Sequence, residues 1–279
     1  MEFTLNTKNL IGEFSWSSNF NISFNKNKVL EVGVDKRPIY GSAANANNAF
    51  ITMPGHPIAS FYGYKYIGVF QSEEELAKYP HLSGDKVGDG RYEDVNKDGV
   101  LDQNDKTILG DNNPLFTAGF SNSFSYKNFT LDIQFTGSYG AEVFSFYKRM
   151  CGIYHGDRNG MIEQLGRWRS ESEPGDGIHF RPTRTPSGWQ RDPSSAWVQD
   201  ASYLRLRNLT FGYNFDQKVL DKIKMKGLRL YVTGQNLFTI TNYVGYDPET
   251  SSESGLSQGG DYLGYPAARS FIIGANITF

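Results

Sequence analysis

The sequence is poor in cysteine and has no excess of charge of either sign, and each absence removes a class of protein. Cys151 is the single cysteine among 279 residues, which excludes a disulfide scaffold and a zinc cluster built on cysteines. The 28 basic and 30 acidic side chains nearly balance, whereas a nucleic-acid-binding domain needs a basic face. An aromatic content of 15% argues against a disordered chain.

The chain also lacks any apolar run of the roughly 18 to 20 residues that a membrane-spanning helix requires. The lack of such a run does not exclude membrane-spanning strands. Only every second residue of such a strand faces lipid, so its mean hydropathy remains low. The first residues, 1–10, have no basic start, apolar core or cleavage site of a signal peptide. We therefore expect the downstream part of a longer protein rather than a complete cytoplasmic one.

Apolar and polar residues alternate with a period of two along several segments, as they do in strands with one apolar face. The segments with this pattern are 14–25, 116–126, 129–139, 203–214, 228–235 and 270–279. In the fourth of them the apolar positions change from even to odd numbers, which indicates either a β-bulge near Asn208 or a strand that passes from one environment into another. The pattern predicts an all-β protein with an antiparallel sheet.

The connections between these segments are of two very different lengths. Lys127 and Asn128 alone join two of them, whereas residues 38–115 and 140–200 form very long connections. Short turns on one side and long loops on the other, with aromatic residues near the strand ends, are typical of a transmembrane β-barrel. A soluble antiparallel sandwich has the same alternation and is the alternative.

One segment, residues 94–105, has the pattern of a calcium-binding loop, with Gly99 at the position of the sharp turn. The candidate ligands are Asp94, Asn96, Asp98, the backbone carbonyl of Val100, Asp102 and Asp105. The last position is Asp105 rather than the bidentate Glu of EF-hands, which predicts weaker binding. Leu101 supplies the apolar side chain that holds the loop on its support. We predict a structural Ca²⁺, and a metal-free turn rich in Asp, Asn and Gly is the alternative.

No catalytic motif is present, so we expect no enzyme activity. Ser72, followed by three glutamates, predicts a short helix, and residues 159–170 predict a second one. Several aromatic residues fit either stacking on sugar rings or simple packing: Tyr62, Tyr64, Tyr66, Trp189 and Trp197.

Seven motifs follow one another in an order that resembles the C-terminal part of SusC/RagA-type TonB-linked outer-membrane proteins, over essentially the whole chain. They are Gly55–Gly68, the acidic loop, Leu109–Phe120, Phe129–Gly140, Ser202–Tyr213, Leu230–Phe238, and finally Gly245–Glu249 with Tyr265–Gly274. The resemblance implies the last part of a barrel of roughly 22 strands, about eight of which this chain supplies. Phe279 then looks like the end of the terminal strand that is read by the outer-membrane assembly machinery.

The resemblance also implies a function and partners. Such proteins sit in the outer membrane of Gram-negative bacteria and import glycan fragments or peptides, driven by the TonB complex. A SusD-like surface lipoprotein covers their extracellular loops. In this interpretation residues 1–279 are barrel, 37–115 form a long extracellular loop region, and Asp132, Gln134 and Asn276 face the lumen.

The plug domain, TonB box and signal peptide are not in the sequence, so we expect a fragment that does not transport alone. A soluble calcium-dependent carbohydrate-binding β-sandwich is the alternative function. A structural or adhesin-like β-protein, with no ligand other than calcium, is a third.

Overall fold

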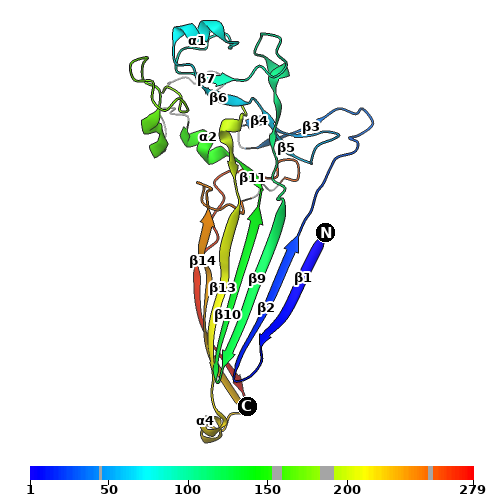
Figure 1. The fold of residues 1–279 in the computed structure, drawn as a ribbon, viewed down its shortest axis with the longest axis vertical. Helices are drawn as coiled ribbons and strands as arrows, with labels where there is room; N and C mark the ends of the chain where they lie inside the picture. The colour runs from blue at the N-terminus through cyan, green and yellow to red at the C-terminus, as the bar shows by residue number, and fades with distance from the viewer. Residues whose placement is uncertain (44–45, 153–158, 183–191, 251–253) are drawn as a thin grey trace.

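The computed structural model describes all residues except 44–45, 153–158, 183–191 and 251–253. A long antiparallel sheet forms one part of the molecule, and most of the smaller elements gather at one of its ends (Figure 1). This arrangement agrees with the predicted all-β, antiparallel class.

Seven strands form the long sheet in the spatial order β1-β2-β9-β10-β13-β14-β16. Their bounds are β1 Glu2–Leu10, β2 Phe14–Ser23, β9 Phe116–Tyr126, β10 Phe129–Tyr139, β13 Tyr203–Asn214, β14 Gly227–Thr241 and β16 Ser270–Thr278. All six predicted strand segments are strands, and β1 is the seventh. The described residues thus place one strand fewer in the sheet than the predicted eight or so.

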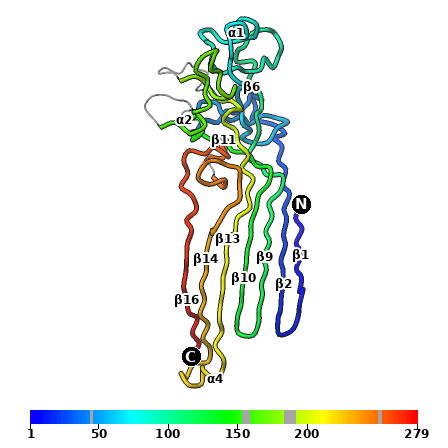
Figure 2. The backbone as a smooth tube through the Cα atoms, turned by 60° about the vertical axis from the view of Figure 1, so that its left-hand side comes forward, coloured from blue at the N-terminus to red at the C-terminus, as the bar shows by residue number. Residues whose placement is uncertain are grey.

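The two ends of the sheet differ in their connections, as predicted. Residues 11–13 join β1 to β2, Lys127 and Asn128 join β9 to β10, and the helix α4 (Gln217–Lys222) lies between β13 and β14 (Figure 2). The connections 24–115, 140–202 and 242–269 leave from the opposite end. We call these three connections together the loop region.

The predicted bulge is present in β13. Gln134 pairs with Asn208 and Phe135 pairs with Leu206, so Arg207 has no partner on β10. The register on the β14 side shifts at the same place. Because one extra residue is inserted, the apolar side chains before and after the bulge stay on the same face of the sheet.

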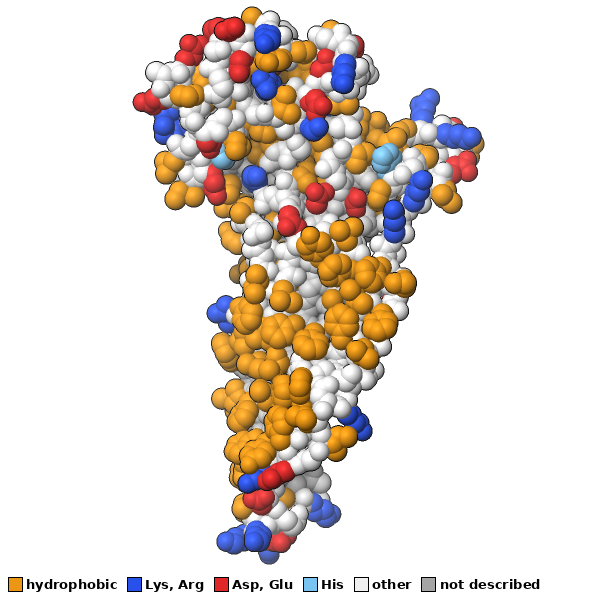
Figure 3. All heavy atoms as spheres, in the orientation of Figure 1, with side chains coloured by type: hydrophobic (Ala, Val, Ile, Leu, Met, Phe, Trp, Pro, Cys, Tyr) orange, Lys and Arg blue, Asp and Glu red, His pale blue; other side chains and the backbone are white. Residues whose placement is uncertain are grey.

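The two faces of the long sheet have opposite character. One face is polar, and the other carries large apolar side chains that are exposed over its whole length (Figure 3). Among the exposed side chains are Phe3, Leu5, Phe120, Phe129, Phe211, Leu230, Val232 and Ile273. Ile273 is 85% exposed, and no other sheet of the described residues is hydrogen-bonded to the long one. We call this surface the apolar face.

Asn122 and Ser18 interrupt the apolar face, and their polar atoms are satisfied locally. The amide oxygen of Asn122 accepts a hydrogen bond from Trp16 Nε1 at 2.9 Å and from Ser18 Oγ at 2.8 Å. Asn122 itself is buried. A polar pair is tolerated on such a face because it does not leave its groups unpaired.

The loop region is folded, where long irregular connections were predicted. Its described residues form three small sheets and several short helices. The sheets are β3 (Ile39–Ala43), β4 (Ala46–Thr52), β5 (Ser60–Gly63) and β8 (Thr107–Gly110); β6 (Tyr66–Val69) and β7 (Gly90–Tyr92); and β12 (Val198–Asp200), β11 (Glu142–Ser145) and β15 (Gly260–Asp261). The helices are α1 (Glu73–Lys78) and α2 (Phe146–Gly152), with 3-10 turns η1 (Gln103–Asp105), η2 (Ile162–Gly166) and η3 (Ser195–Trp197).

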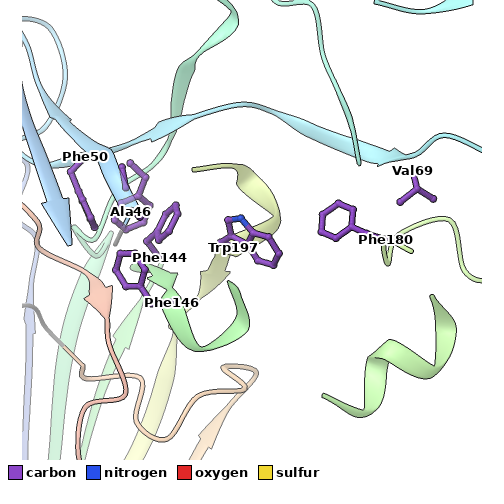
Figure 4. Close-up of a cluster of buried hydrophobic side chains, with 9 residues drawn as sticks. Ala46, Phe50, Val69, Phe144, Phe146, Phe180 and Trp197 are labelled. Atoms are coloured by element: carbon purple, nitrogen blue, oxygen red, sulfur yellow. The ribbon is translucent and has the colours of Figure 1, made fainter. Parts of the chain in front are cut away.

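The largest buried core of the described residues lies in the loop region. Phe50, Phe61, Phe144 and Phe146 are fully buried, and their ring centroids are 5.1–6.1 Å apart (Figure 4). The core joins the first and second long connections, because Phe50 and Phe61 come from the first and Phe144 and Phe146 from the second. Tight contact of this kind holds the loop region in one arrangement.

Of the two predicted helices, one is present. Ser72 caps α1 and accepts a hydrogen bond from the Glu75 amide at 3.2 Å. Residues 159–170 form only the turn η2, because the chain leaves it as an extended segment in which the Trp168 amide donates to the carbonyl of His179. Among the described residues, the helices are all too short or too polar to span a membrane.

Candidate functional site

The acidic loop lies in the loop region between β7 and β8, and its first and last residues hold it closed. Asp94 Oδ2 accepts a hydrogen bond from the Gly99 amide at 2.9 Å. Asp105 is fully buried, and its carboxylate accepts from the amides of Val95 at 2.9 Å and Asp102 at 2.8 Å. Gly99 has a φ of +83°, a conformation that favours glycine, so the sharp turn predicted there is present.

The loop is anchored as predicted by Leu101. This side chain is 4% exposed and belongs to a small buried cluster with Tyr64, Leu82 and Tyr92. The anchor fixes the position of the loop against β6 and β7, but it leaves Asn96, Asp98 and Asn104 at the surface.

Two of the other candidate ligands, Asp98 and Asp102, accept hydrogen bonds from backbone amides of the loop itself. Asp98 Oδ1 accepts from the Val100 amide at 2.8 Å, and Asp102 Oδ1 accepts from the Asn104 amide at 2.7 Å. No three acidic, histidine or cysteine side chains form a metal cluster in the described ranges. The structure therefore has the fold of the loop but does not bring all predicted ligands together.

One observation fits a cation in this loop. Asp94 Oδ1 is buried and has no hydrogen-bond partner, although it is one oxygen of a carboxylate. A buried carboxylate oxygen without a donor is unfavourable, and a hard cation is the partner that such an oxygen prefers. Asp94 would supply this oxygen, and the carboxylates of Asp98, Asp102 and Asp105 would have to turn from backbone amides toward the ion.

The polar face of the long sheet carries the residues predicted to face the lumen. Asp132 accepts a hydrogen bond from Ser123 Oγ at 2.7 Å and lies 4.0 Å from Arg229 Nη2. Gln134 and Asn276 are exposed on β10 and β16. By the strand register these residues share one face, opposite the apolar face.

An ion-pair network was not predicted from the sequence, and it lies at the end of this face that is next to the loop region. Arg205, which is 3% exposed, donates to Asp247 at 2.6 Å, to Glu249, and to Thr239 Oγ1 at 2.8 Å. Arg207 Nη2 also donates to Glu249 at 2.6 Å. Two of the quoted motifs, Ser202–Tyr213 and Gly245–Glu249, therefore bind each other, and their charges were the signal that could have indicated it.

The network changes the acidity of its carboxyl groups. Burial acts to raise the pKa of Asp247, but the hydrogen bonds from Arg205 and two backbone amides outweigh it and hold the pKa below its usual range. For Glu249, burial likewise acts to raise the pKa, but the hydrogen bonds from Arg207 and Tyr203 outweigh it, so the pKa lies below its usual range. Both groups are thus held as carboxylates, and the third long connection is fastened to β13.

The aromatic residues weighed for sugar stacking are mostly packing residues. Tyr64 is 1% exposed and Trp197 is 3% exposed, so neither presents a free ring face to solvent. Tyr66 packs against Tyr92 and Phe180. Trp189 lies outside the described residues.

The chain was compared with family models, curated proteins and solved structures. No family model matches it. It is 35% identical over 289 residues to TonB-dependent receptor P3 of Formosa agariphila, an alignment that covers 100% of this chain and 28% of the receptor. It is 27% identical to TonB-dependent receptor SusC of Bacteroides thetaiotaomicron, covering 100% of this chain and 26% of SusC.

Among solved structures, the RagAB peptide transporter superimposes on the chain with a TM-score of 0.79 and 19% identity, covering 100% of this chain and 28% of that one. At this identity the likeness shows the fold. The chain spans little more than a quarter of the length of the curated relatives. These relatives are receptors rather than enzymes, in agreement with the expected lack of enzyme activity.

Proposed function

Because the chain corresponds to the C-terminal portion of a TonB-dependent receptor of the SusC/RagA type, we propose that it forms part of the wall and the extracellular loops of an outer-membrane transporter. In this proposal the receptor takes up glycan fragments or peptides in a Gram-negative bacterium, driven by the TonB complex. A SusD-like surface lipoprotein covers the loop region, and residues 37–115 belong to that region.

The observation that carries the proposal is the apolar face. Burying a single large apolar side chain stabilises a protein by about 1.5–3 kcal/mol, so a row of exposed phenylalanine, leucine and isoleucine side chains is unfavourable in water. The same row is favourable in lipid, where alternate residues of each strand meet the hydrocarbon. The short turns at one end and the folded loop region at the other fit the two sides of a membrane.

The soluble carbohydrate-binding sandwich fits less well. A sandwich buries one face of each sheet against the other. Here the small sheets lie beyond the end of the long sheet, and the apolar face is exposed (Figures 1 and 3).

Fractionation of cells that express the receptor carrying this chain tests the proposal. We expect the protein in the outer membrane, extractable by detergent but not by salt or carbonate. Deletion of its gene should abolish growth on the imported nutrient. A protein that remains monodisperse in buffer without detergent would overturn the assignment.

We further propose that residues 94–105 hold a structural Ca²⁺, with Asp94, Asn96, Asp98, Val100, Asp102 and Asp105 as ligands. The support is the closed loop and the unpartnered buried oxygen of Asp94. Hard oxygen donors in this number suit calcium better than zinc or copper. The ion would fix the loop rather than carry out chemistry.

Calorimetric titration of the metal-free receptor with Ca²⁺ tests this second proposal. The Asp98→Ala variant should lose most of the binding heat, whereas Asp35→Ala, an exposed aspartate elsewhere in the loop region, should behave like the parent. Equal heats from the parent and Asp98→Ala would remove the calcium assignment.

A further inference from the structure

Four lysines gather on the turn between β13 and β14, at the end of the long sheet opposite the loop region (Figures 1 and 3). The turn comprises residues 215–226 and contains α4. The lysines are all exposed, and we call them the lysine cluster: Lys218, Lys222, Lys224 and Lys226. Neither the strands of the long sheet nor the acidic loop involves them.

The charge of the lysine cluster is not compensated within the turn. None of the four lysines forms an ion pair with any residue that the structure describes. The two acidic residues of the turn, Asp216 and Asp221, each accept a hydrogen bond from a side-chain amide, at 2.7 Å and 2.8 Å. In the neighbouring turn, by contrast, Lys127 Nζ lies 3.5 Å from a carboxylate oxygen of Glu13. The lysine cluster is therefore free to meet an anion from outside the chain.

Two apolar side chains of the same turn are exposed beside the lysines. Val219 is 42% exposed and Ile223 is 44% exposed. They are four residues apart, so they lie on one side of α4, whereas Leu220 between them is buried. Lysines next to exposed apolar side chains are typical of short helices that lie in the interface between lipid head groups and hydrocarbon.

The apolar face ends at this turn in a group of aromatic residues. The ring of Tyr213 lies 4.9 Å from that of Phe129 and 5.1 Å from that of Phe215, measured between centroids. Aromatic residues of a transmembrane barrel form girdles at the two membrane interfaces. Because α4 begins two residues after Phe215, the lysine cluster of the proposed transporter lies at the level of the lipid head groups.

We propose that the lysine cluster binds the phosphate groups of anionic phospholipids in the periplasmic leaflet, with Val219 and Ile223 against their acyl chains. The short turns of a barrel lie on the periplasmic side, which assigns the leaflet. A lysine close to an anionic membrane surface strengthens binding about fivefold, so four of them select a negatively charged head group over a zwitterionic one. The inference rests on the proposed transporter and adds a lipid partner to it.

A lipid competition with the whole purified receptor tests the inference. The receptor is incubated in detergent with equal amounts of phosphatidylglycerol and phosphatidylcholine of the same chain length. The lipids that remain bound after washing are extracted and quantified by mass spectrometry. We expect about a fivefold or greater excess of phosphatidylglycerol. Raising the salt from 0.1 to 1 M shortens the Debye length from about 10 Å to about 3 Å and should remove most of this excess. Equal retention of the two lipids at low salt overturns the inference.

Two matched variants locate the binding. Replacing all four lysines of the cluster by glutamine should abolish the excess of phosphatidylglycerol. The control replaces four exposed cations of the loop region by glutamine: Lys26, Lys28, Lys36 and Arg37. It removes the same charge from the receptor and should keep the excess. An excess that survives in the first variant, or falls equally in both, overturns the inference. If the fourfold variant does not assemble, Lys218→Gln with Lys222→Gln should lower the excess in part, and an unchanged excess in this pair overturns the inference as well.

Soluble peptidoglycan fragments, which also carry carboxylates, serve as the competing anion in the same mixture. Displacement of phosphatidylglycerol by these fragments would assign the lysine cluster to the cell wall and overturn the inference. The location of the receptor in cells is measured separately. A receptor that is absent from the outer membrane removes the proposed transporter, whereas a receptor that assembles there but retains no excess of phosphatidylglycerol removes only the lipid site.

Discussion

At the scale of single residues, the strongest interactions join parts of the chain that are far apart in the sequence. Arg205 binds Asp247 and Glu249, which are more than 40 residues away. Alternation along 203–214 could place Arg205 on the polar face, and the opposite charges of the two motifs were a signal of pairing, but the sequence contains many other carboxylates and does not single out Asp247 and Glu249. Pairing of this kind depends on where the third long connection returns over the sheet.

Removing the arginine should release that connection. In Arg205→Leu the buried carboxylate of Asp247 loses its partner, which should cost on the order of 3 kcal/mol. We expect amide hydrogen exchange in residues 242–250 to speed up at least tenfold. Arg269→Leu, which changes an exposed arginine on the same connection, should leave exchange there unchanged. Equal protection in both variants would contradict the role given to Arg205.

Asp85 should make the loop region more stable in mild acid. Burial raises the pKa of Asp85 to about 6, partly opposed by the hydrogen bond from the Leu82 amide. Since the folded pKa lies above the unfolded value of about 3.9, the folded state binds the extra proton between these values, and stability rises as the pH falls from 7 to about 5. Hydrogen exchange of residues 80–90, corrected for intrinsic rates, measures the effect.

Asp85→Asn separates this group from others that titrate in the same range. The variant resembles the protonated form, so it should be more protected at pH 7 and lose most of the pH dependence. Asp35→Asn, at an exposed site, should keep the parent profile. A profile in Asp85→Asn as steep as the parent's would show that another group is responsible.

At the scale of elements, the sequence predicted the strands of the long sheet well and those of the loop region poorly. A strand with one apolar face has a period of two that extends over ten residues, and the phase change near Asn208 even located the bulge. The strands β5, β6, β7 and β11 have only three or four residues, which is too short for an alternation to be recognised. Their pairing is set by partners from distant segments.

The pairing of β14 with β16 depends on a glycine. Tyr231 lies opposite Gly274 in the register, and a Cβ at position 274 would overlap the phenol ring. Gly274→Val should therefore displace Tyr231 and destabilise the last strand by about 1–3 kcal/mol. Ala275→Val on the other face is the control, and the double variant Gly274→Val with Tyr231→Ala should recover stability. The midpoint of thermal unfolding in detergent measures all three, and a normal midpoint in Gly274→Val would contradict this packing.

At the scale of the whole molecule, the division into a sheet and a loop region could be predicted from the lengths of the connections. The core of the loop region could not. Phe50 and Phe144 pack together across more than 90 residues of sequence, and each stands in a segment without a clear period. The calcium loop lies between these extremes, because its motif predicted the turn at Gly99 and the anchor at Leu101 but not where every carboxylate points.

Substitution by a charged residue can test which face of the long sheet lies in lipid, because a lipid-facing position does not tolerate a charge. Ile133 and Gln134 are neighbours on β10 and point to opposite faces at the same height, so the pair compares the two environments directly. A lysine on the lipid side of a barrel costs about 2–4 kcal/mol near the middle of the membrane, whereas a lumen-facing lysine is hydrated. We therefore expect Ile133→Lys to abolish or strongly reduce assembly of the receptor in the outer membrane, and Gln134→Lys to assemble normally. The amount of folded receptor in purified outer membranes, read from its resistance to unfolding in detergent on gels, measures both. Normal assembly of Ile133→Lys together with failure of Gln134→Lys would mean that the polar face, and not the apolar face, lies in lipid. Equal assembly of both variants would mean that neither face of β10 lies in lipid.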